Sequence, residues 1–146
     1  MPENRSAGTI MNYTSGTTGN PKGVKRGLAP AEVEPDLIYT MMTAFLGMFG
    51  IQAENDNAHI CGSPLYHTAV LMFASSSLHF DHAVVLMEKW TPEAMLQLID
   101  QYQCTTSHMV PTQFHRMFAL PDDVRGKYDC SSTRNMIHAA APCPPT

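Results

Sequence analysis

The stretch Tyr13–Arg26 reads YTSGTTGNPKGVKR. Its first twelve residues, Tyr13–Val24, contain three glycines, four small hydroxyl residues, one proline and one lysine. Glycines let a backbone turn sharply and approach a ligand closely, and successive backbone N–H groups in such turns bind anions. The hydroxyl groups add donors and Lys22 adds a positive charge. The stretch therefore predicts a loop that binds a chain of phosphates.

Two common phosphate loops do not fit this stretch. The Walker A pattern is G-x-x-x-x-G-K-[ST], and Pro21 stands where its second glycine would follow Gly16. The G-x-G-x-x-G of dinucleotide-binding folds is also missing. The simpler alternative is a surface turn of a hairpin that binds nothing.

The composition limits what kind of protein this is. The 146 residues are the size of one ordinary domain, and 44% of them are apolar, which is enough for a core. Only 15% are charged, which indicates that part of the surface is covered by something else. The net charge of −4, without a Lys/Arg run, argues against nucleic-acid binding. No apolar run is long enough to span a membrane, and the first residues, MPENRSAGT, do not read as a signal peptide.

The cysteines and histidines do not predict a metal site. The four cysteines, Cys61, Cys104, Cys130 and Cys143, form no CxxC and fit no zinc module, so reduced thiols in a cytosolic protein are expected. The tight pair of His79 and His82 has no further ligand nearby in the sequence, and we expect a solvated loop there.

Hydrophobic periodicity alternates between strand-like and helix-like segments. Pro35, Pro92 and Pro111 each stand where a predicted helix begins, and Thr91 is placed to cap the second of these helices. The predicted elements are strand 9–14, return strand 23–25, helix 35–50, strand 59–62, helix 68–78, strand 83–87, helix 92–102, strand 105–110, helix 111–118 and strand 134–139.

This alternation predicts an α/β fold, a mostly parallel sheet with covering helices. The apolar run 83–87 (AVVLM) is typical of a strand that is buried on both faces. Ligands of open α/β sheets bind beyond the carboxyl ends of the strands, so the residues after the last strand are expected beside a site.

Three segments resemble one family, in the same order. Tyr13–Val24 resembles the signature loop of the adenylate-forming superfamily, which contains acyl-CoA synthetases, luciferases and the adenylation domains of peptide synthetases. Pro64–Ala69 (PLYHTA) is similar to the second core motif, commonly PLFH, and favours the acyl-CoA synthetases. Residues 139–142 (AAAP) resemble the adenine-contacting GAAP-type motif, with Ala where Gly is usual.

The resemblance implies that residues 1–146 are a partial AMP-binding domain, part of the large N-terminal domain of an adenylate-forming enzyme. The family's YGxTE motif, its ribose-binding aspartate and its catalytic lysine would all lie beyond Thr146. We therefore expect the rest of the same polypeptide to be the main partner of this chain.

The resemblance also implies an activity and a set of site residues. The parent enzyme would use ATP, Mg²⁺ and CoA to convert a carboxylic acid, expected to be a fatty acid, into an acyl-adenylate and then an acyl-CoA. His67 would lie between the acyl pocket and the nucleotide as the catalytic candidate, and Lys22 would add electrostatic steering without being the catalytic lysine. The other binding residues implied are Thr14, Ser15, Gly16, Thr17, Thr18 and Gly19 for the phosphates with Mg²⁺, and Ala140, Ala141 and Pro142 for adenine.

Several alternatives stay open at this point. His67 can be a buried histidine bonded to a backbone carbonyl, residues 140–142 can be a plain strand end, and the 11 methionines can fill a core rather than line an acyl tunnel. The ligase reading, in which the isolated fragment is inactive, competes with a non-catalytic remnant or nucleotide-binding module. The expected compartment is the cytoplasm.

Overall fold

The computed structural model describes residues 11–14, 20, 22–25, 27, 35–53, 56–139 and 142. The chain divides into two compact units, Met1–Met41 and Met42–Thr146. The predicted hairpin belongs to the first unit and the predicted parallel sheet to the second.

The first unit contains an antiparallel hairpin of β1 (Asn12–Thr14) and β2 (Lys22–Val24). The register pairs Asn12 with Val24 and Thr14 with Lys22, so the chain leaves β1 and returns in β2 at the same level. The hairpin predicted from the sequence is confirmed. Helix α1 (Pro35–Gly47) also begins in this unit, at the predicted proline.

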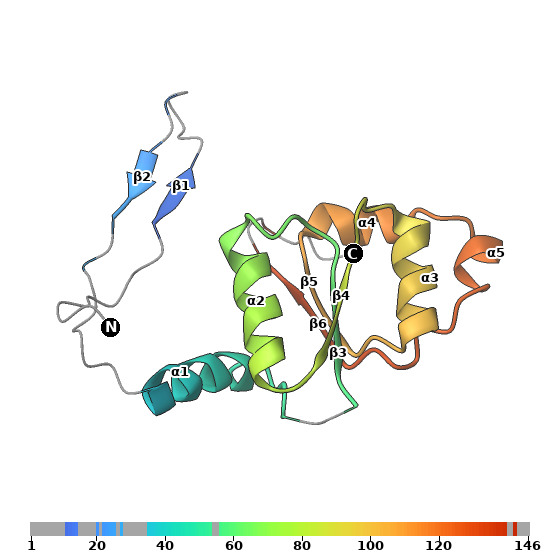
Figure 1. The fold of residues 1–146 in the computed structure, drawn as a ribbon. Coiled ribbons are helices and arrows are strands. Elements are labelled where there is room, and N and C mark those ends of the chain that lie inside the picture. The colour runs from blue at the N-terminus through green and yellow to red at the C-terminus, as the bar shows by residue number, and fades with distance from the viewer. Residues whose placement is uncertain are drawn as a thin grey trace. The chain divides into compact units, whose positions relative to one another are not determined.

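The second unit is a parallel four-stranded sheet with helices on both faces (Figure 1). In the order β4-β3-β5-β6, every neighbouring pair of strands is parallel, which confirms the predicted fold class. Helix α2 covers one face, and α3 and α4 cover the other (Figure 1). The bounds are β3 (Ala58–Cys61), α2 (Thr68–His79), β4 (Ala83–Leu86), α3 (Pro92–Tyr102), β5 (Thr106–Met109), α4 (Pro111–Phe118), α5 (Asp122–Arg125) and β6 (Asn135–His138).

Alternation along the strands divides the core between the two faces. The α3 face is filled by Ala58, Ile60, Met95, Ile99, Cys104 and Met109. The α2 face holds two smaller clusters, one of Cys61, Val70 and Ala74 and one of Leu46, Ile51 and Phe73. A sheet covered on both faces in this way is rigid, and its edges are where function is to be sought.

Helix α3 has the start that the sequence predicts. The hydroxyl of Thr91 accepts a hydrogen bond from the Ala94 N–H at 3.1 Å, and Pro92 occupies the first helical turn. A side-chain cap of this kind stabilises a helix by about 1 kcal/mol. At the other end Gln103 adopts a left-handed conformation, with φ at 49°.

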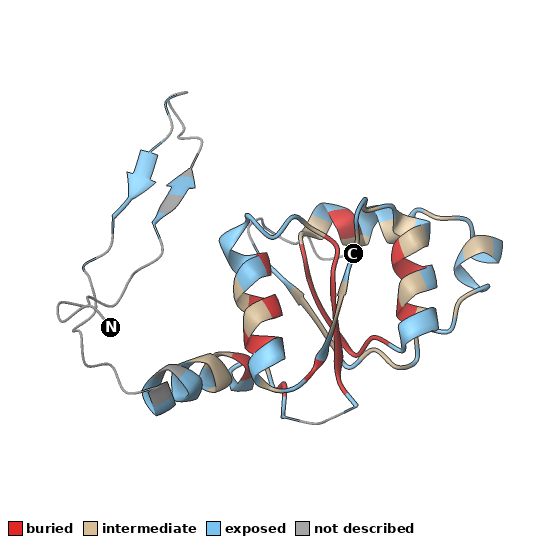
Figure 2. Cartoon of the chain, viewed as in Figure 1, coloured by how far each residue is buried: buried red, intermediate tan, exposed pale blue. Residues whose placement is uncertain are grey.

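The prediction for the apolar run 83–87 is wrong about burial. β4 lies at the edge of the described sheet, and Ala83 and Leu86 are exposed, Leu86 by 56% (Figure 2). The two central strands, β3 and β5, are buried throughout instead. The sequence predicted both strands but not their complete burial, because they carry His, Thr and Ser rather than an unbroken aliphatic run.

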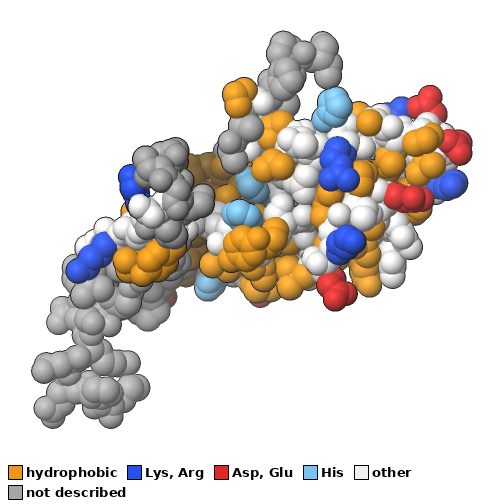
Figure 3. All heavy atoms as spheres, turned by 90° about the horizontal axis from the view of Figure 1, so that it is seen from above, with side chains coloured by type: hydrophobic (Ala, Val, Ile, Leu, Met, Phe, Trp, Pro, Cys, Tyr) orange, Lys and Arg blue, Asp and Glu red, His pale blue; other side chains and the backbone are white. Residues whose placement is uncertain are grey.

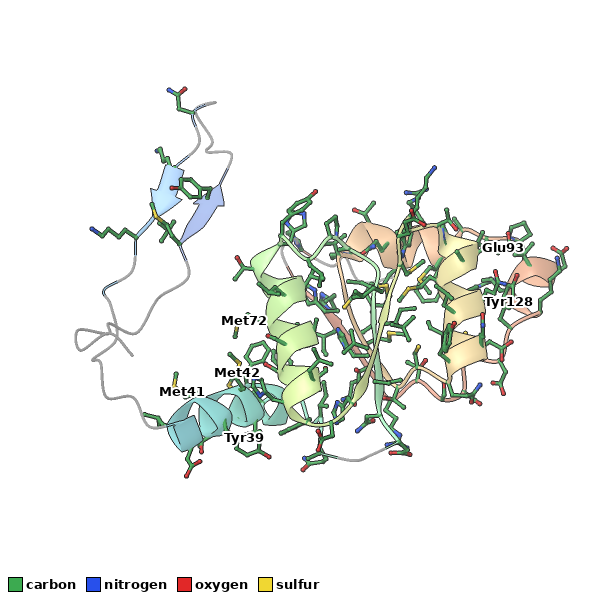
Figure 4. The ribbon with its side chains drawn as sticks, in the orientation of Figure 1. Tyr39, Met41, Met42, Met72, Glu93 and Tyr128 are labelled. Atoms are coloured by element: carbon green, nitrogen blue, oxygen red, sulfur yellow. The ribbon has the colours of Figure 1, made fainter. Side chains whose placement is uncertain are left out.

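Two details of the predicted helices also need correction. The apolar face of the predicted helix 35–50 consists of Leu37, Met41, Ala44, Phe45 and Met48, but Met48 lies beyond the end of α1 and is exposed, while Leu46 is fully buried. The apolar face of the predicted helix 92–102 consists of Met95, Leu98, Ile99 and Tyr102, and Tyr102 is half exposed. The short helix α5 was not predicted at all, because its sequence is polar and has no apolar period. The segment after α5 is tied to α3 by a hydrogen bond of 3.0 Å from the Tyr128 hydroxyl to Glu93 (Figure 4).

Polar side chains in the central strands are paired with neighbouring groups. The Thr105 hydroxyl accepts from the Ala58 N–H at 3.0 Å and donates to the Asn57 Oδ1 at 2.8 Å. The Ser107 hydroxyl donates to the Ile60 carbonyl at 2.8 Å, which adds a side-chain bond between β5 and β3. Because a buried polar group without a partner is costly, these bonds are what makes polar central strands tolerable.

Three histidines are buried in this unit. The ring of Phe73 stacks on both His59 and His108, with centroids 6.0 and 5.0 Å away. His59, which is 1% exposed, shares a hydrogen bond of 2.9 Å with Thr106. His82 is also buried, with its Nε2 3.0 Å from the Gln52 carbonyl, so the solvated loop expected at 79–82 is wrong for His82.

The buried histidines make the fold sensitive to acid. Burial, and then the neighbouring His108 and His82, lower the pKa of His59 from 6.5 to about 4. The folded state therefore keeps His59 neutral down to about pH 4, whereas His59 of the unfolded chain binds its proton below about pH 6.5. The contribution of His59 to the free energy of unfolding is complete above pH 6.5. It is lost as the pH drops from 6.5 to about 4, and the loss reaches about 3 kcal/mol.

The prediction is checked by urea unfolding at pH 7, 5.5 and 4.5, followed by the fluorescence of Trp90, the single tryptophan. His59→Gln is expected to reduce the drop in the free energy of unfolding between pH 6.5 and 4. The matched control is His115→Gln, which changes an exposed histidine and is expected to leave the slope unchanged. Equal acid slopes in wild type and His59→Gln would contradict the assignment.

Candidate functional site

The carboxyl ends of the four parallel strands lie at one edge of the sheet. β3 is followed there by the loop 62–67, β4 by 87–91, β5 by Val110 and β6 by Ala139. This is the edge at which open α/β sheets bind ligands. Figure 3 looks onto it from above, and hydrophobic and histidine side chains are prominent among those drawn.

Gly62 allows the loops after β3 and β4 to pack together. A Cβ on Gly62 would stand 2.7 Å from Cδ1 and 3.0 Å from Nε1 of Trp90, so only glycine leaves room for the indole. The guanidinium of Arg116, from α4, lies 5.0 Å from the centre of the Trp90 ring. The packing of the indole thus links the connections that follow two neighbouring strands.

Gln113 adds the connection after β5. Its Nε2 donates to the Gly62 carbonyl at 3.0 Å, and its Oε1 accepts from the Val110 N–H at 3.0 Å. The side chain is buried, and both halves of its amide are used. Sequence reasoning missed Gln113, although its place three residues after Val110 at the start of a helix is the capping-box position.

His67 lies at the start of α2. Its backbone is extended (φ −77°, ψ 125°) and its carbonyl accepts the first helical hydrogen bond, from the Leu71 N–H at 3.0 Å. The imidazole does not cap the helix; it is exposed and rests against Tyr66, with ring centroids 4.7 Å apart. The alternative of a buried histidine bonded to a backbone carbonyl is therefore wrong. The ring lies at the carboxyl edge of the sheet, and its place between an acyl pocket and a nucleotide stays a prediction.

The other predicted site residues are described only in part. Lys22 is exposed and pairs with Thr14 across the base of the loop in the first unit. Pro142, beyond β6 in the second unit, is exposed. The residues that lie outside the described ones are Ser15, Gly16, Thr17, Thr18, Gly19, Ala140 and Ala141. Within the second unit, His67 and Pro142 both follow the carboxyl ends of strands.

A cavity of the second unit lies at the opposite, amino edge of the sheet. It has a volume of about 460 Å³ and is lined by Gly50, Ile51, Gln52, Asn57, Arg134 and Asn135. Its polar groups are already engaged: Arg134 pairs with Asp56 at 2.6 Å and so lowers the pKa of that carboxyl. Asn135 donates to the Phe49 carbonyl at 3.0 Å. These contacts hold the turn after α1 against the sheet. They indicate a structural role for Arg134 and Asn135, not a catalytic one.

Metal ligation and membrane insertion find no support in the part of the chain that is described. No three His, Cys, Asp or Glu side chains gather there in a way that would hold a metal ion. None of the described helices combines the length and the apolar character needed to cross a membrane. Cys61, Cys104 and Cys130 carry free thiols.

The chain matches the family described as AMP-binding enzyme over residues 2–146. It is 36% identical over 138 residues to the acyl-CoA ligase SID4 of Ajellomyces capsulatus, covering 92% of this chain and 21% of that one. It is 33% identical to the 2-succinylbenzoate–CoA ligase of Bacillus licheniformis, covering 85% of this chain and 24% of that one. The chain thus spans less than a quarter of the length of these relatives.

Solved structures agree on the fold. The N-terminal domain of FACL13 from Mycobacterium tuberculosis matches with a TM-score of 0.69 at 24% identity, over 92% of this chain and 31% of that one. ATP-bound MatB from Rhodopseudomonas palustris matches with a TM-score of 0.65 at 23% identity, over 91% and 24%. At such identities the likeness concerns the architecture alone.

The contacts of Gln113 generate a prediction about the carboxyl edge. Gln113→Leu leaves the Val110 N–H and the Gly62 carbonyl without their partner, and a loss of about 1–3 kcal/mol in the free energy of unfolding is expected. Gln97→Leu, which makes the same change at an exposed position of α3, is expected to cost less than about 0.5 kcal/mol. Urea unfolding followed by circular dichroism compares the two. Equal costs would mean that the Gln113 amide does not hold the edge together.

Proposed function

The chain belongs to the family of AMP-binding enzymes, and from this premise we propose that it is part of an ATP-dependent acid–CoA ligase. The ligase joins a carboxylic acid to AMP and then transfers the acyl group to CoA. The observation that carries the proposal is the stretch Tyr13–Val24, whose two ends form the paired strands of a hairpin.

The hairpin suits a phosphate-binding role. Thr14 and Lys22 are partners at the loop end of the hairpin, so the glycine- and hydroxyl-rich residues 15–21 leave and return at one point. The exposed Lys22 adds positive charge at that point. We assign the β- and γ-phosphates of MgATP to Thr14, Ser15, Gly16, Thr17, Thr18 and Gly19, with Lys22 steering the nucleotide.

The first step needs positioning more than proton transfer. The acid is already ionised at neutral pH, because its reference pKa is near 4. A carboxylate oxygen attacks the α-phosphorus, the bond to the bridging oxygen breaks, and pyrophosphate leaves with the electron pair. The protein must neutralise the charge that grows on the departing phosphates, which the loop and Lys22 would do.

The second step releases AMP. The sulfur of CoA attacks the acyl carbon, the bond to the AMP oxygen breaks, and the thiol loses its proton. We assign His67 to orient the carboxylate or to gate the thiol, since its imidazole is exposed at the carboxyl edge and is not used by the helix it begins. Ala140, Ala141 and Pro142 would lie against the adenine, where small side chains let the backbone come close.

A fatty acid is the substrate class we favour. Met42 and Met72 lie on the same side of α2 (Figure 4), and the sulfur of Met42 is 3.5 Å from the hydroxyl of Ser76. Flexible thioether side chains suit an acyl chain of variable shape. The relatives named above act on different acids, so chain length is a matter for direct assay.

A non-catalytic nucleotide-binding module is the second candidate. It would keep the hairpin and its affinity for phosphates but would not couple them to an acid. The free thiols of Cys61, Cys104 and Cys130 support a reducing compartment, and we propose the cytoplasm. One relative is named a peroxisomal OPC-8:0-CoA ligase, which makes the peroxisome the alternative.

The ligase and the module differ in one measurement. An enzyme that contains this chain is expected to release pyrophosphate from ATP only when a carboxylic acid is present. The assay compares fatty and aryl acids with a buffer blank. Release that does not respond to any acid would contradict the ligase and favour the module.

Loop shape is expected to matter more than loop charge. Lys22→Ala removes one solvated charge and is expected to weaken ATP use about three- to tenfold. Gly16→Val adds a β-branched side chain where several N–H groups must reach the phosphates, and a loss of at least about a hundredfold is expected. Pyrophosphate exchange measures both, with Lys25→Ala and Gly27→Val as controls nearby. A Gly16→Val enzyme with near-normal exchange would contradict the assignment of the loop.

The 146-residue chain by itself is expected to be inactive. By the family resemblance, the ribose-binding aspartate and the catalytic lysine lie outside it. An apolar groove of about 320 Å³, lined by Leu65, Leu71, Ala74, Ser75, Leu78, Val84 and Leu86, is also open, and the chain is expected to associate through such surfaces. Light scattering and acyl-CoA formation test this. A monomer that melts cooperatively and turns over would show that the chain is self-sufficient.

A further inference from the structure

Tyr13 and Gly23 form a tight pair across the hairpin. They are direct partners in the register of β1 and β2. A Cβ built on Gly23 would stand 3.1 Å from Cε1 and 3.6 Å from Cδ1 of Tyr13, so the edge of the tyrosine ring lies over the glycine. The Tyr13 hydroxyl points to the sulfur of Met11, 3.7 Å away.

The role of Gly23 is therefore different from that of a ligand-approaching glycine. A glycine within a strand weakens it, because it has no side chain to pack and loses much entropy on folding. An aromatic ring across the strand compensates by covering the bare backbone. The Met11 Cε is closer still, at 2.6 Å from that Cβ, but it ends a flexible side chain that moves easily. The ring of Tyr13 is the contact that fixes the pair.

We propose that Tyr13 is a positioning residue for the phosphate loop, and that it acts through Gly23. The inference rests on the proposed function, in which residues 14–22 hold the phosphates of ATP. Tyr13 itself touches no phosphate in this proposal; its ring holds the two strands in one register. The register then decides where the loop begins and ends.

The strand register of a short hairpin is only weakly fixed. β1 and β2 have three residues each, so few backbone bonds oppose a slip. A slip by one residue would move Lys22 to the other face of the hairpin and offset it from Thr14. Only the fraction of molecules in the correct register would bind phosphate, and the apparent Kd would rise in inverse proportion to that fraction.

The ring has two other possible uses, and each gives a different result. Its outer surface is open, with 71% of Tyr13 exposed, so it can serve as a platform for the nucleotide base. Its hydroxyl can serve as a hydrogen-bond donor to a ligand. A positioning role needs the ring but not the hydroxyl, and it acts on pyrophosphate, which has no base.

The experiment uses an enzyme that contains this chain and measures its binding of pyrophosphate with Mg²⁺ present, by calorimetry. The Hα resonances of Gly23 are recorded in the same enzyme with its glycines labelled. In the wild type the ring current of Tyr13 is expected to shift a Gly23 Hα resonance away from its position in Tyr13→Ala. Tyr13→Ala is expected to remove this shift and weaken pyrophosphate binding about two- to fivefold. Tyr13→Phe is expected to keep both. The matched control Tyr102→Ala changes a tyrosine of α3 that is half exposed and is expected to change neither.

A double substitution tests that the effect passes through Gly23. Gly23→Ala is expected to weaken binding in the wild-type background, because the new methyl meets the ring. In the Tyr13→Ala background the same change is expected to cost nothing further. Independent, additive costs would mean that the two residues do not act as a pair, and would overturn the proposal.

The remaining outcomes separate this inference from the function on which it rests. Wild-type affinity in Tyr13→Ala overturns the positioning role and leaves the phosphate loop intact. Equal weakening in Tyr13→Phe and Tyr13→Ala overturns it too, because the hydroxyl would then be the active group. If the wild type shows the ring-current shift but does not bind pyrophosphate, the proposed function of the loop fails, and the positioning role fails with it.

Discussion

Gly62 has no side chain, and the arrangement of the carboxyl edge depends on the space this leaves. The indole of Trp90 fills it, 2.7 Å from where a Cβ would stand, and Gln113 bonds to the carbonyl of the same glycine. Three connections that are distant in the sequence are thereby held at one point. The loop that starts at Gly62 ends at His67, so this packing fixes one end of the segment that carries the imidazole.

The central strands β3 and β5 carry polar side chains although they are buried throughout. Strands buried on both faces are usually aliphatic, because every polar side chain in them must find a partner. Here His59 bonds to Thr106 and Ser107 bonds to the Ile60 carbonyl, so the polar side chains tie β3 to β5. His108 is different: it is 5% exposed, stacks on Phe73, and neither ring nitrogen has a hydrogen-bond partner. Burial lowers its pKa, so the sheet holds this ring in its neutral form.

The sequence predicted the parallel sheet and the hairpin, because proline starts, apolar periods and family motifs are local signals. It did not predict that β4 is an outer strand of the described sheet, with a neighbouring strand on one side. The run AVVLM of β4 reads as a fully buried strand, but burial depends on neighbours, and β4 has one neighbour in the described sheet. The bond from Gln113 to the Gly62 carbonyl was missed for the same reason, since it joins residues far apart in the sequence, whereas its bond with the Val110 N–H is a local capping-box contact. The phosphate loop itself, residues 15–19, stays a prediction from the motif.

The hairpin that carries the loop and the parallel sheet are stabilised by different contacts. The second unit has a core on both faces of four strands, whereas the hairpin has two short strands, and an isolated two-stranded hairpin is marginal in water. Met11, Tyr13 and Val24 are all substantially exposed on it. Reactions that depend on charge neutralisation at fixed distances tolerate little error in position. A loop with this task between two such short strands needs cross-strand contacts, and the contact of the Tyr13 ring with Gly23 is one that the described residues supply.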